Sequence, residues 1–449
     1  MTAGGWLTRK LSRLPRGGSR SRIHSTFASL RVRNYRLYFI GQSVSVAGSW
    51  MQNVALSWYV LQLTGSGVQL GFTVAIRYLP LLLLGPWGGL VTDRMDRRRL
   101  LLATQIAAAV LSGLLAIGVA VNLASLAMVY VVSGLLGLVN VLSNPGRQTF
   151  VNELVPNNLL ANAIVLNSVS GNVARVIGPV ISGALIASVG VSLCLAANAL
   201  SFGAVIYSLA RMDREDLTAA EKIPRARRQL RAGFAYVWRT PQLLIPLIMT
   251  TVVGTFAWEF QVTLPLIASG AFHRGSLFYG IMLACVGVGA MVGAFVVAGR
   301  PATASAMGVA RSGVFWGISI LLAALAPFTY LEFAALILVG YGTISFNSLA
   351  KTSLQVTAAP PMLGRVMALW AVTWQGTTPI GGPTVGWIGD TFGARWSLMA
   401  GALPTIAVCV IAMPFLRRAG TVTPHDVDGV RGRIREDVEG TDPSKLTAI

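Results

Sequence analysis

Long apolar runs recur along the chain, each close to the length needed to cross a bilayer. A membrane-spanning α-helix needs about 20 mostly apolar residues to cover about 30 Å of hydrocarbon. Short polar turns separate the runs, apart from one longer polar stretch in the middle of the chain. The pattern predicts an all-α membrane protein with twelve transmembrane helices, at residues 35–63, 68–92, 98–121, 125–148, 159–189, 191–209, 242–269, 277–297, 308–326, 332–354, 364–389 and 394–416.

The second half of the sequence repeats the first. A shift of 204 residues aligns Arg147 with Lys351, Pro156 with Pro360, Leu159 with Leu363, and Gly178-Pro179 with Gly382-Pro383. We therefore expect two pseudo-symmetric six-helix bundles. The predicted domains are a disordered basic tail (1–34), the first bundle (35–210), a linker (211–240), the second bundle (241–417) and a second disordered tail (418–449).

Composition agrees with membrane insertion. The chain has 449 residues, of which 54% are hydrophobic and 12% charged, and a mean hydropathy of +0.65, which excludes a soluble globular protein. The net charge of +20 comes mainly from Lys and Arg in the tails, the linker and the turns on the same side. Basic residues are retained in the cytoplasm, so both termini are predicted to be cytoplasmic. We expect no nucleic-acid partner.

One short charged turn between the second and third predicted helices carries the most specific motif. The spacing of Gly89, Asp93, Arg94, Arg97 and Arg98 resembles the signature loop of the major facilitator superfamily. The family usually has a second Gly where this chain has Asp96. The resemblance implies that these residues, with Arg147 at the end of the fourth helix, gate the cytoplasmic side, and that Asp93 docks on the opposite half. The alternative is a solvated basic loop that serves only topology.

Other segments resemble exporters within that superfamily. Gly178, Pro179 and Gly183 on the fifth helix resemble its exporter motif. Proline weakens a helix and glycine permits close contact, so we expect a bend and tight packing between the halves. The segments 33–35, 144–147 and 154–156 resemble the branch of enterobactin-exporter and macrolide-efflux-type proteins, over about residues 30–417. Under the 204-residue shift Asp93 falls on Val297, so the second half lacks the charged gate loop.

Three ionisable residues lie deep within predicted helices, at the level of the hydrocarbon interior: Arg77, Arg175 and Glu259. Each costs about 2.5–3.5 kcal/mol in the bilayer on insertion scales, which makes it a functional candidate. Burial disfavours the charged carboxylate, so Glu259 is predicted to carry a proton inward as substrate leaves. The alternative is a structural ion pair between Glu259 and either arginine.

Polar and aromatic residues on the first, fourth, seventh, tenth and eleventh helices suit an amphipathic organic ligand. The candidate substrate-binding residues are Gln52, Asn53, Trp58, Asn140, Trp258, Tyr341, Asn347 and Trp374. The alternative is that the amides join helices and the Trp rings mark membrane interfaces. The excess of buried Arg over Glu favours an anionic or catechol-like substrate.

The sequence as a whole predicts a secondary active transporter of the inner or plasma membrane. We expect a monomer that exports a drug, siderophore or secondary metabolite by alternating access, with the proton gradient as its energy source and no cofactor. The three histidines, His24, His273 and His425, lie in tails or loops, and the three cysteines have no metal-site spacing. We therefore expect no enzyme and no metal site. The alternatives are a sensor with the facilitator fold, or an importer without proton antiport.

Overall fold

The computed structural model describes residues 27–213, 234, 236–299 and 305–418, without the side chains of residues 86–94, 361 and 418. Most of the predicted tails and linker therefore lies outside the described residues. Every regular element within them is helical. A short 3-10 helix at Ala28–Arg31 precedes the six helices of the first half: α2 (Arg33–Thr64), α3 (Gly67–Arg94), α4 (Arg97–Ala120), α5 (Leu126–Leu154), α6 (Asn157–Val189) and α7 (Val191–Ala210).

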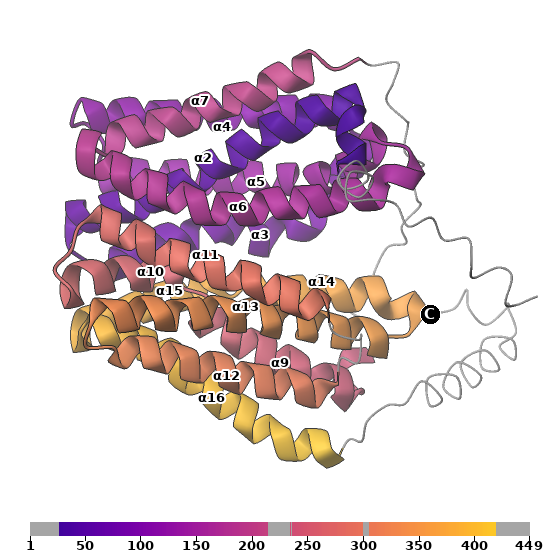
Figure 1. Cartoon of the computed structure of the whole chain (residues 1–449), viewed down its shortest axis with the longest axis vertical. Coiled ribbons are helices and arrows are strands. Elements are labelled where there is room, and N and C mark those ends of the chain that lie inside the picture. The colour runs from indigo at the N-terminus through magenta and orange to yellow at the C-terminus, as the bar shows by residue number, and fades with distance from the viewer. Residues whose placement is uncertain (1–26, 214–233, 235, 300–304, 419–449) are drawn as a thin grey trace, which may run out of the picture.

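The second half is also helical and lies beside the first half (Figure 1). Its elements are α9 (Pro241–Phe256), α10 (Phe260–Leu266), a π-helical turn (Ile267–Ala271), α11 (Ser276–Ala298), α12 (Ala306–Leu325), α13 (Thr329–Thr357), a 3-10 turn (Pro360–Met362), α14 (Leu363–Gln375), α15 (Thr378–Phe392) and α16 (Ala394–Arg418). The predicted and observed boundaries differ by a few residues. The largest difference is in α5, which continues past Pro145 to Leu154.

Two predicted helices are broken. The helix expected at 242–269 is interrupted between α9 and α10, and the helix expected at 364–389 is interrupted between α14 and α15. The second break has a local cause, because Gly376 separates the two pieces and α15 begins with a proline in its first turn. The first break contains no Gly or Pro and coincides with Glu259.

Ten described helices are long and apolar enough to cross a bilayer. Neither α2 nor the α14–α15 pair is among them. Helix α2 has 32 residues, but the adjacent amides Gln52 and Asn53 lower its hydropathy. The break leaves α14 and α15 with 13 and 15 residues, each short of the length for crossing alone. The two remaining crossings of the expected twelve depend on these segments.

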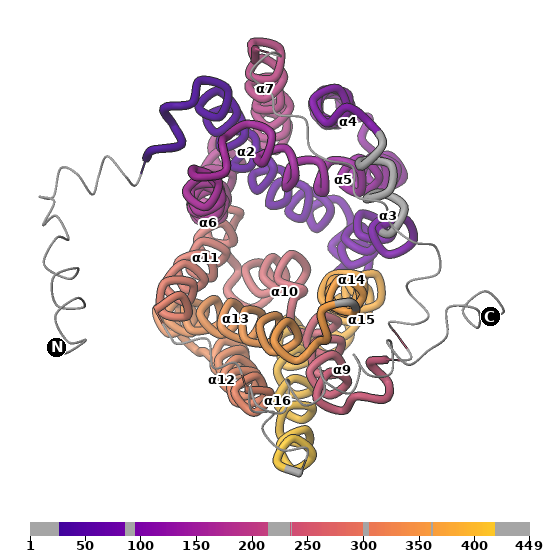
Figure 2. The backbone as a smooth tube through the Cα atoms, turned by 90° about the vertical axis from the view of Figure 1, so that its right-hand side faces the viewer, coloured from indigo at the N-terminus to yellow at the C-terminus, as the bar shows by residue number. Residues whose placement is uncertain are grey.

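The two halves meet along two pairs of helices. The end-on view in Figure 2 shows α6 beside α11 at one edge and α3 beside α15 at the other. We call the end of the molecule where α2 begins, α7 ends and α9 begins the linker face, and the other end the opposite face. A hydrophobic core extends through both halves, with Leu115 and Leu195 among its fully buried members in the first half and Met249 and Met282 in the second.

Candidate functional site

A cavity of about 180 Å³ lies between the halves, and we call it the central cavity. Both halves contribute to its wall. From α2, α3 and α6 come Trp50, Asn53, Tyr78 and Arg175; from the α9–α10 break, α10, α11, α13 and α14 come Trp258, Phe260, Gln261, Leu283, Val286, Ala290, Thr343 and Gln375. The wall is mostly apolar with a few convergent polar groups, as is usual for small-molecule sites.

Two further cavities continue from the central cavity along the first half. The N-half cavity, about 150 Å³, shares Trp50 and Asn53 with the central cavity. The linker-face cavity, about 450 Å³, shares Val46 and Arg147 with the N-half cavity. Its other lining residues lie near the start of α2, the end of α5 and the start of α6. The three cavities therefore form a row from the linker face to the middle of the molecule.

Arg77 and Arg175 both line this row of cavities. The Arg77 guanidinium donates a hydrogen bond to Asn53 Oδ1. Arg175 lies over the ring of Trp50, with its guanidinium carbon 5.3 Å from the ring centroid, which is a cation–π geometry. Neither arginine forms an ion pair with Glu259 among the described residues, where the ion pairs are Arg33–Asp213, Arg97–Glu153 and Arg99–Asp96.

Glu259 lies in the break before α10, and its side chain is only 2% exposed. The neighbouring residues Trp258 and Phe260 line the central cavity, whereas the carboxylate is packed against the start of α15. A Cβ added at Gly381 would lie 3.2 Å from Glu259 Oε1, and one at Gly382 would lie 3.5 Å from Oε2. Oε1 has no hydrogen-bond partner. The carboxylate thus sits at the positive end of a half-helix, which favours negative charge.

The predicted substrate-binding amides have different surroundings. Asn53 lines both the central and the N-half cavity, and Asn140 lines the N-half cavity. Gln52 also borders the N-half cavity but is 2% exposed. Its Oε1 accepts hydrogen bonds from Ser112 Oγ, at 2.8 Å, and from Asn198 Nδ2. Gln52 therefore joins α2 to α4 and α7.

The predicted aromatic residues divide between the cavity and the packed interior. Trp258 lines the central cavity. Trp374 is 6% exposed, with its ring centroid 5.1 Å from that of Trp258, so it supports the cavity wall from behind. Trp58 is buried and stacks on Tyr279 of α11, which makes it a contact between the halves. Tyr341 packs on Phe315, and Asn347 is half-buried on α13.

The predicted gate turn begins and ends close to where the sequence places it. Helix α3 ends at Arg94 and α4 begins at Arg97. Asp96 is the N-cap of α4, and its carboxylate accepts a 3.0 Å hydrogen bond from the Arg99 amide. This cap explains why Asp, a preferred N-cap residue, replaces the glycine usual in the family. Gly89, Asp93 and Arg94 belong to α3, but their side chains lie outside the described part of the chain.

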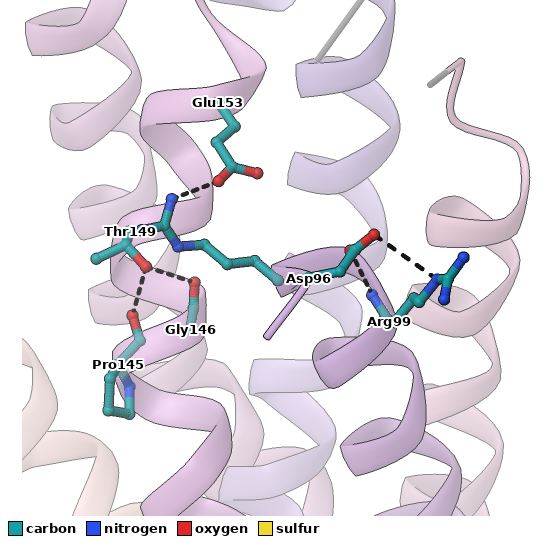
Figure 3. Close-up of polar contacts among 7 residues, drawn as sticks. Asp96, Arg99, Pro145, Gly146, Thr149 and Glu153 are labelled. Carbon is teal, nitrogen blue, oxygen red and sulfur yellow. Dashed lines mark hydrogen bonds and ion pairs between the residues drawn. The ribbon is translucent and has the colours of Figure 1, made fainter. Parts of the chain in front are cut away.

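Arg97 and Arg98 connect the gate turn to other helices of the same half. Arg97 forms an ion pair with Glu153 on α5, and Glu153 points toward the turn that holds Asp96 and Arg99 (Figure 3). The Arg98 Nε donates to the Leu209 carbonyl at 2.8 Å and its Nη2 to that of Ala210 at 3.3 Å. A cation at the C-terminus of α7 is favoured by the helix dipole. Arg147 donates to Ser143 Oγ at 3.0 Å and borders two cavities.

At the opposite face, Asp390 at the end of α15 caps the start of α3. Its carboxylate accepts hydrogen bonds from the Gly67 amide at 2.6 Å, the Val68 amide at 3.0 Å and Ser66 Oγ at 2.8 Å. This is an N-cap supplied by the other half of the molecule. The local sequence around Asp390 gives no indication of this contact, because its partners lie more than 300 positions away.

Glycines allow the backbones of the two halves to touch near the opposite face. A Cβ at Gly71 would collide with the Gly382 carbonyl, and one at Gly386 with that of Gly67. We call the α3–α15 contact, including the Asp390 cap, the outer seam. The predicted exporter motif lies at the other contact and beside α2. A Cβ at Gly183 would lie 2.7 Å from the Ser276 carbonyl oxygen of α11, and one at Gly178 would lie 2.7 Å from Trp50 Cβ.

Several cavity residues escaped the sequence reasoning. Tyr78, Gln261, Thr343 and Gln375 line the central cavity, but they are uncharged and belong to none of the motifs in the sequence. Glu332, in the first turn of α13, is fully buried; it stands at the first residue of the helix predicted at 332–354. A useful signal was available for Tyr78 and Gln261, since each follows an ionisable candidate closely in sequence.

Comparison with known proteins gives consistent results. Residues 24–424 match the family described as transmembrane secretion effector, of the major facilitator superfamily. The staphyloferrin A transporter of Staphylococcus aureus is 21% identical over 84% of this chain and 94% of its own length. The multidrug efflux pump Tap of Mycobacterium tuberculosis is 25% identical over 86% of this chain and 94% of its own length. The macrolide efflux protein A of Streptococcus pyogenes is 22% identical over 85% of this chain and 96% of its own length.

Solved structures share the fold. A POT family transporter in complex with 5-aminolevulinic acid has a TM-score of 0.70 at 12% identity, covering 86% of this chain and 96% of that one. A bacterial homologue of the iron transporter ferroportin in an inward-facing state has a TM-score of 0.65 at 14% identity, covering 86% and 98%. The resemblance seen in the gate turn is thereby confirmed: this multi-pass membrane protein belongs to the transmembrane secretion effector family of the major facilitator superfamily.

Proposed function

We propose that this protein is a proton-coupled secondary exporter of an amphipathic small molecule, which works by alternating access in the plasma membrane. The observation that carries the proposal is a cavity lined by both halves, which connects through shared residues to a larger cavity at the linker face. The efflux names of the relatives support the direction of transport. In this proposal the linker face is cytoplasmic, and α2 and the α14–α15 pair complete twelve crossings.

The outer seam supports the alternating-access part of the proposal. Close backbone contact between α3 and α15, with the Asp390 cap, closes the opposite face. Export requires this seam to separate while the halves approach at the linker face, where Arg147 and the gate turn lie. Packed interfaces of this kind are bistable, so small changes at a bound ligand can shift the balance between two arrangements.

Helix α15 offers a mechanical link from Glu259 to the outer seam. Gly381 and Gly382 at its start lie against the Glu259 carboxylate, and Gly386 and Asp390 further along meet α3. Protonation of Glu259 removes the charge that the positive end of α15 favours. We propose that this change shifts α15 and biases the seam. A proton entering the cell gains about 2.3 kcal/mol per 100 mV of membrane potential.

The Glu259→Gln variant tests proton coupling. In proteoliposomes with an imposed pH gradient, we expect the variant to lose gradient-driven accumulation of a fluorescent substrate at least tenfold. It should retain substrate exchange at equal pH, because the cavity wall is unchanged. Glu332→Gln removes a second buried carboxylate, which does not line the central cavity, and should behave like wild type. Undiminished accumulation with unchanged pH dependence in Glu259→Gln would exclude the coupling role.

A further inference from the structure

Three arginines follow one another along the row of cavities. Arg147 borders the linker-face cavity and the N-half cavity, Arg77 borders the N-half cavity, and Arg175 borders the central cavity. They come from three helices, α5, α3 and α6. All three belong to the first half, so one wall of the path carries the positive charge.

None of the three has an acidic partner within the described residues. Arg147 donates to Ser143 Oγ, Arg77 to Asn53 Oδ1, and Arg175 lies over Trp50. The Nε atoms of Arg147 and Arg175 are buried without any hydrogen-bond partner. A buried charge normally pairs with another charge or faces a functional cavity, because an unpaired one is costly.

The facing wall from the second half does not supply the missing negative charge. Its polar contributions to the central cavity are the neutral side chains of Gln261, Thr343 and Gln375. Glu259, between the lining residues Trp258 and Phe260, is packed against the start of α15 rather than lining the cavity.

We infer that the cargo is an organic anion with an apolar, ring-containing body. Its carboxylate or acidic phenolate pairs with Arg175, whose guanidinium fork suits such planar oxygen pairs. Its body lies between Trp50 and Trp258, which line the central cavity. Arg147 and Arg77 draw the anion inward along the row. This inference rests on the proposed transport function and specifies its substrate class.

The experiment uses three dansyl probes that share one fluorophore. One carries a carboxylate, one a primary amide of the same chain length and one a quaternary ammonium. Fluorescence anisotropy with the purified full-length protein in detergent measures binding without requiring transport. We expect the carboxylate to bind at least tenfold more tightly than the amide, and the ammonium to bind most weakly.

Variants of Arg175 then locate the preference. Arg175→Gln should lower carboxylate affinity at least tenfold while leaving amide affinity unchanged, which also shows that the variant is folded. Arg175→Lys should retain part of the preference because it keeps the charge without the fork. Arg311→Gln removes an exposed arginine on α12 and should match wild type. Equal affinity for the three probes, no measurable affinity for any, or a preference unchanged in Arg175→Gln would overturn the inference.

Transport of the same probes into proteoliposomes distinguishes the two proposals. Preferential binding of the carboxylate without any gradient-driven movement would support the anion site and contradict the transport function. Gradient-driven movement of all three probes at equal rates would support the transport function and contradict the anion preference.

Discussion

Glu259 is a carboxylate held in the interior, and it forms no ion pair with any of the basic residues that the structure describes. Its neighbours are the backbone of α15 and the glycines that make room for it. A carboxylate in such a place is tolerated when it can take up a proton, and a helix N-terminus lowers the cost of losing that proton again. A glutamate beside Arg77 or Arg175 would instead have formed a fixed ion pair. The packing of the Glu259 side chain therefore distinguishes the two roles predicted for it, and it favours proton uptake over a structural ion pair.

The buried amide of Gln52, in the first half, has a structural role rather than a ligand-binding one. Gln52 was a candidate ligand, but its carbonyl oxygen is used by Ser112 and Asn198. Hydrogen bonds between membrane helices contribute about 0.6 kcal/mol on average and up to about 1.7. The network thus stabilises the packing of α2, α4 and α7 by a modest amount and orients the polar surface of α2.

The Asn198→Ala variant tests this structural role. Asn198 is fully buried and lies outside the linings of the described cavities. We expect the variant to lower the melting temperature in detergent by a few degrees, because the side-chain hydrogen bonds to Gln52 and Ser201 and the packing of the amide are lost. Substrate affinity should stay within about twofold of wild type. Thermal unfolding and probe binding measure the two effects. A large loss of affinity at unchanged melting temperature would make the amide network part of the binding site.

At the scale of the element, α15 is the most informative helix. Its start contacts Glu259, its middle touches α3 through Gly382 and Gly386, and Asp390 near its end caps α3. The helix is short because the chain breaks at Gly376, and this break separates its movement from that of α14. A half-helix that contacts a buried carboxylate at its start and caps the other half near its end is suited to transmit a local change.

The Asp390→Asn variant tests the outer seam. The amide keeps one acceptor oxygen and loses the charge, and an N-cap contributes about 1 kcal/mol. We therefore expect the population open at the opposite face to rise about fivefold. Spin labels at Asn122, in the turn after α4, and at Tyr330, in the first turn of α13, report the opening by electron paramagnetic resonance distance measurement. Tyr330 is 86% exposed, which suits labelling.

Asp96→Asn is the matched control for that measurement. Asp96 also caps a helix, α4, but it does so within its own half. Its replacement should leave the Asn122–Tyr330 distances unchanged. Equal distance distributions in wild type and Asp390→Asn would mean that the cap contributes nothing to closure of the opposite face.

At the scale of the whole molecule, the two halves share a helix plan but differ in detail. The first and fifth helices of the first half, α2 and α6, are continuous, whereas both of their counterparts in the second half are broken. The three arginines lie in the first half, and the buried carboxylate that faces a break lies in the second. The first half thus carries the arginines that line the cavities, and the second half carries the two broken helices.

Membrane orientation is a property of the whole chain and can be tested directly. We expect fusions to green fluorescent protein after residue 220 and at the C-terminus to fluoresce, because Lys and Arg favour retention in the cytoplasm and are frequent in the linker and the tails. Alkaline phosphatase inserted at Asn122 should be active, because that turn lies at the opposite face. Termini on different sides of the membrane, or a phosphatase signal from the linker, would contradict the proposed topology.

The sequence by itself determined the helical membrane architecture, the repeat and the family. These depend on hydropathy, on charge bias and on the spacing in the gate turn, all of which are local or periodic. It also located the start and end of α3 and α4 to within a few residues and identified Arg77, Arg175 and Glu259 as residues of interest. These features can be recognised from sequence because a charge placed in the hydrocarbon costs free energy whatever the rest of the fold is.

Tertiary structure alone decided how those residues are used. Which arginines face a cavity, whether Glu259 meets a cation or a helix end, and that Asp390 caps a helix of the other half all depend on contacts between distant segments. The break at Glu259 also contains no Gly or Pro from which it could have been predicted. Which helices pack together depends on complementary shapes and on hydrogen bonds between them. The sequence of one helix alone does not show which residues of another helix will face it.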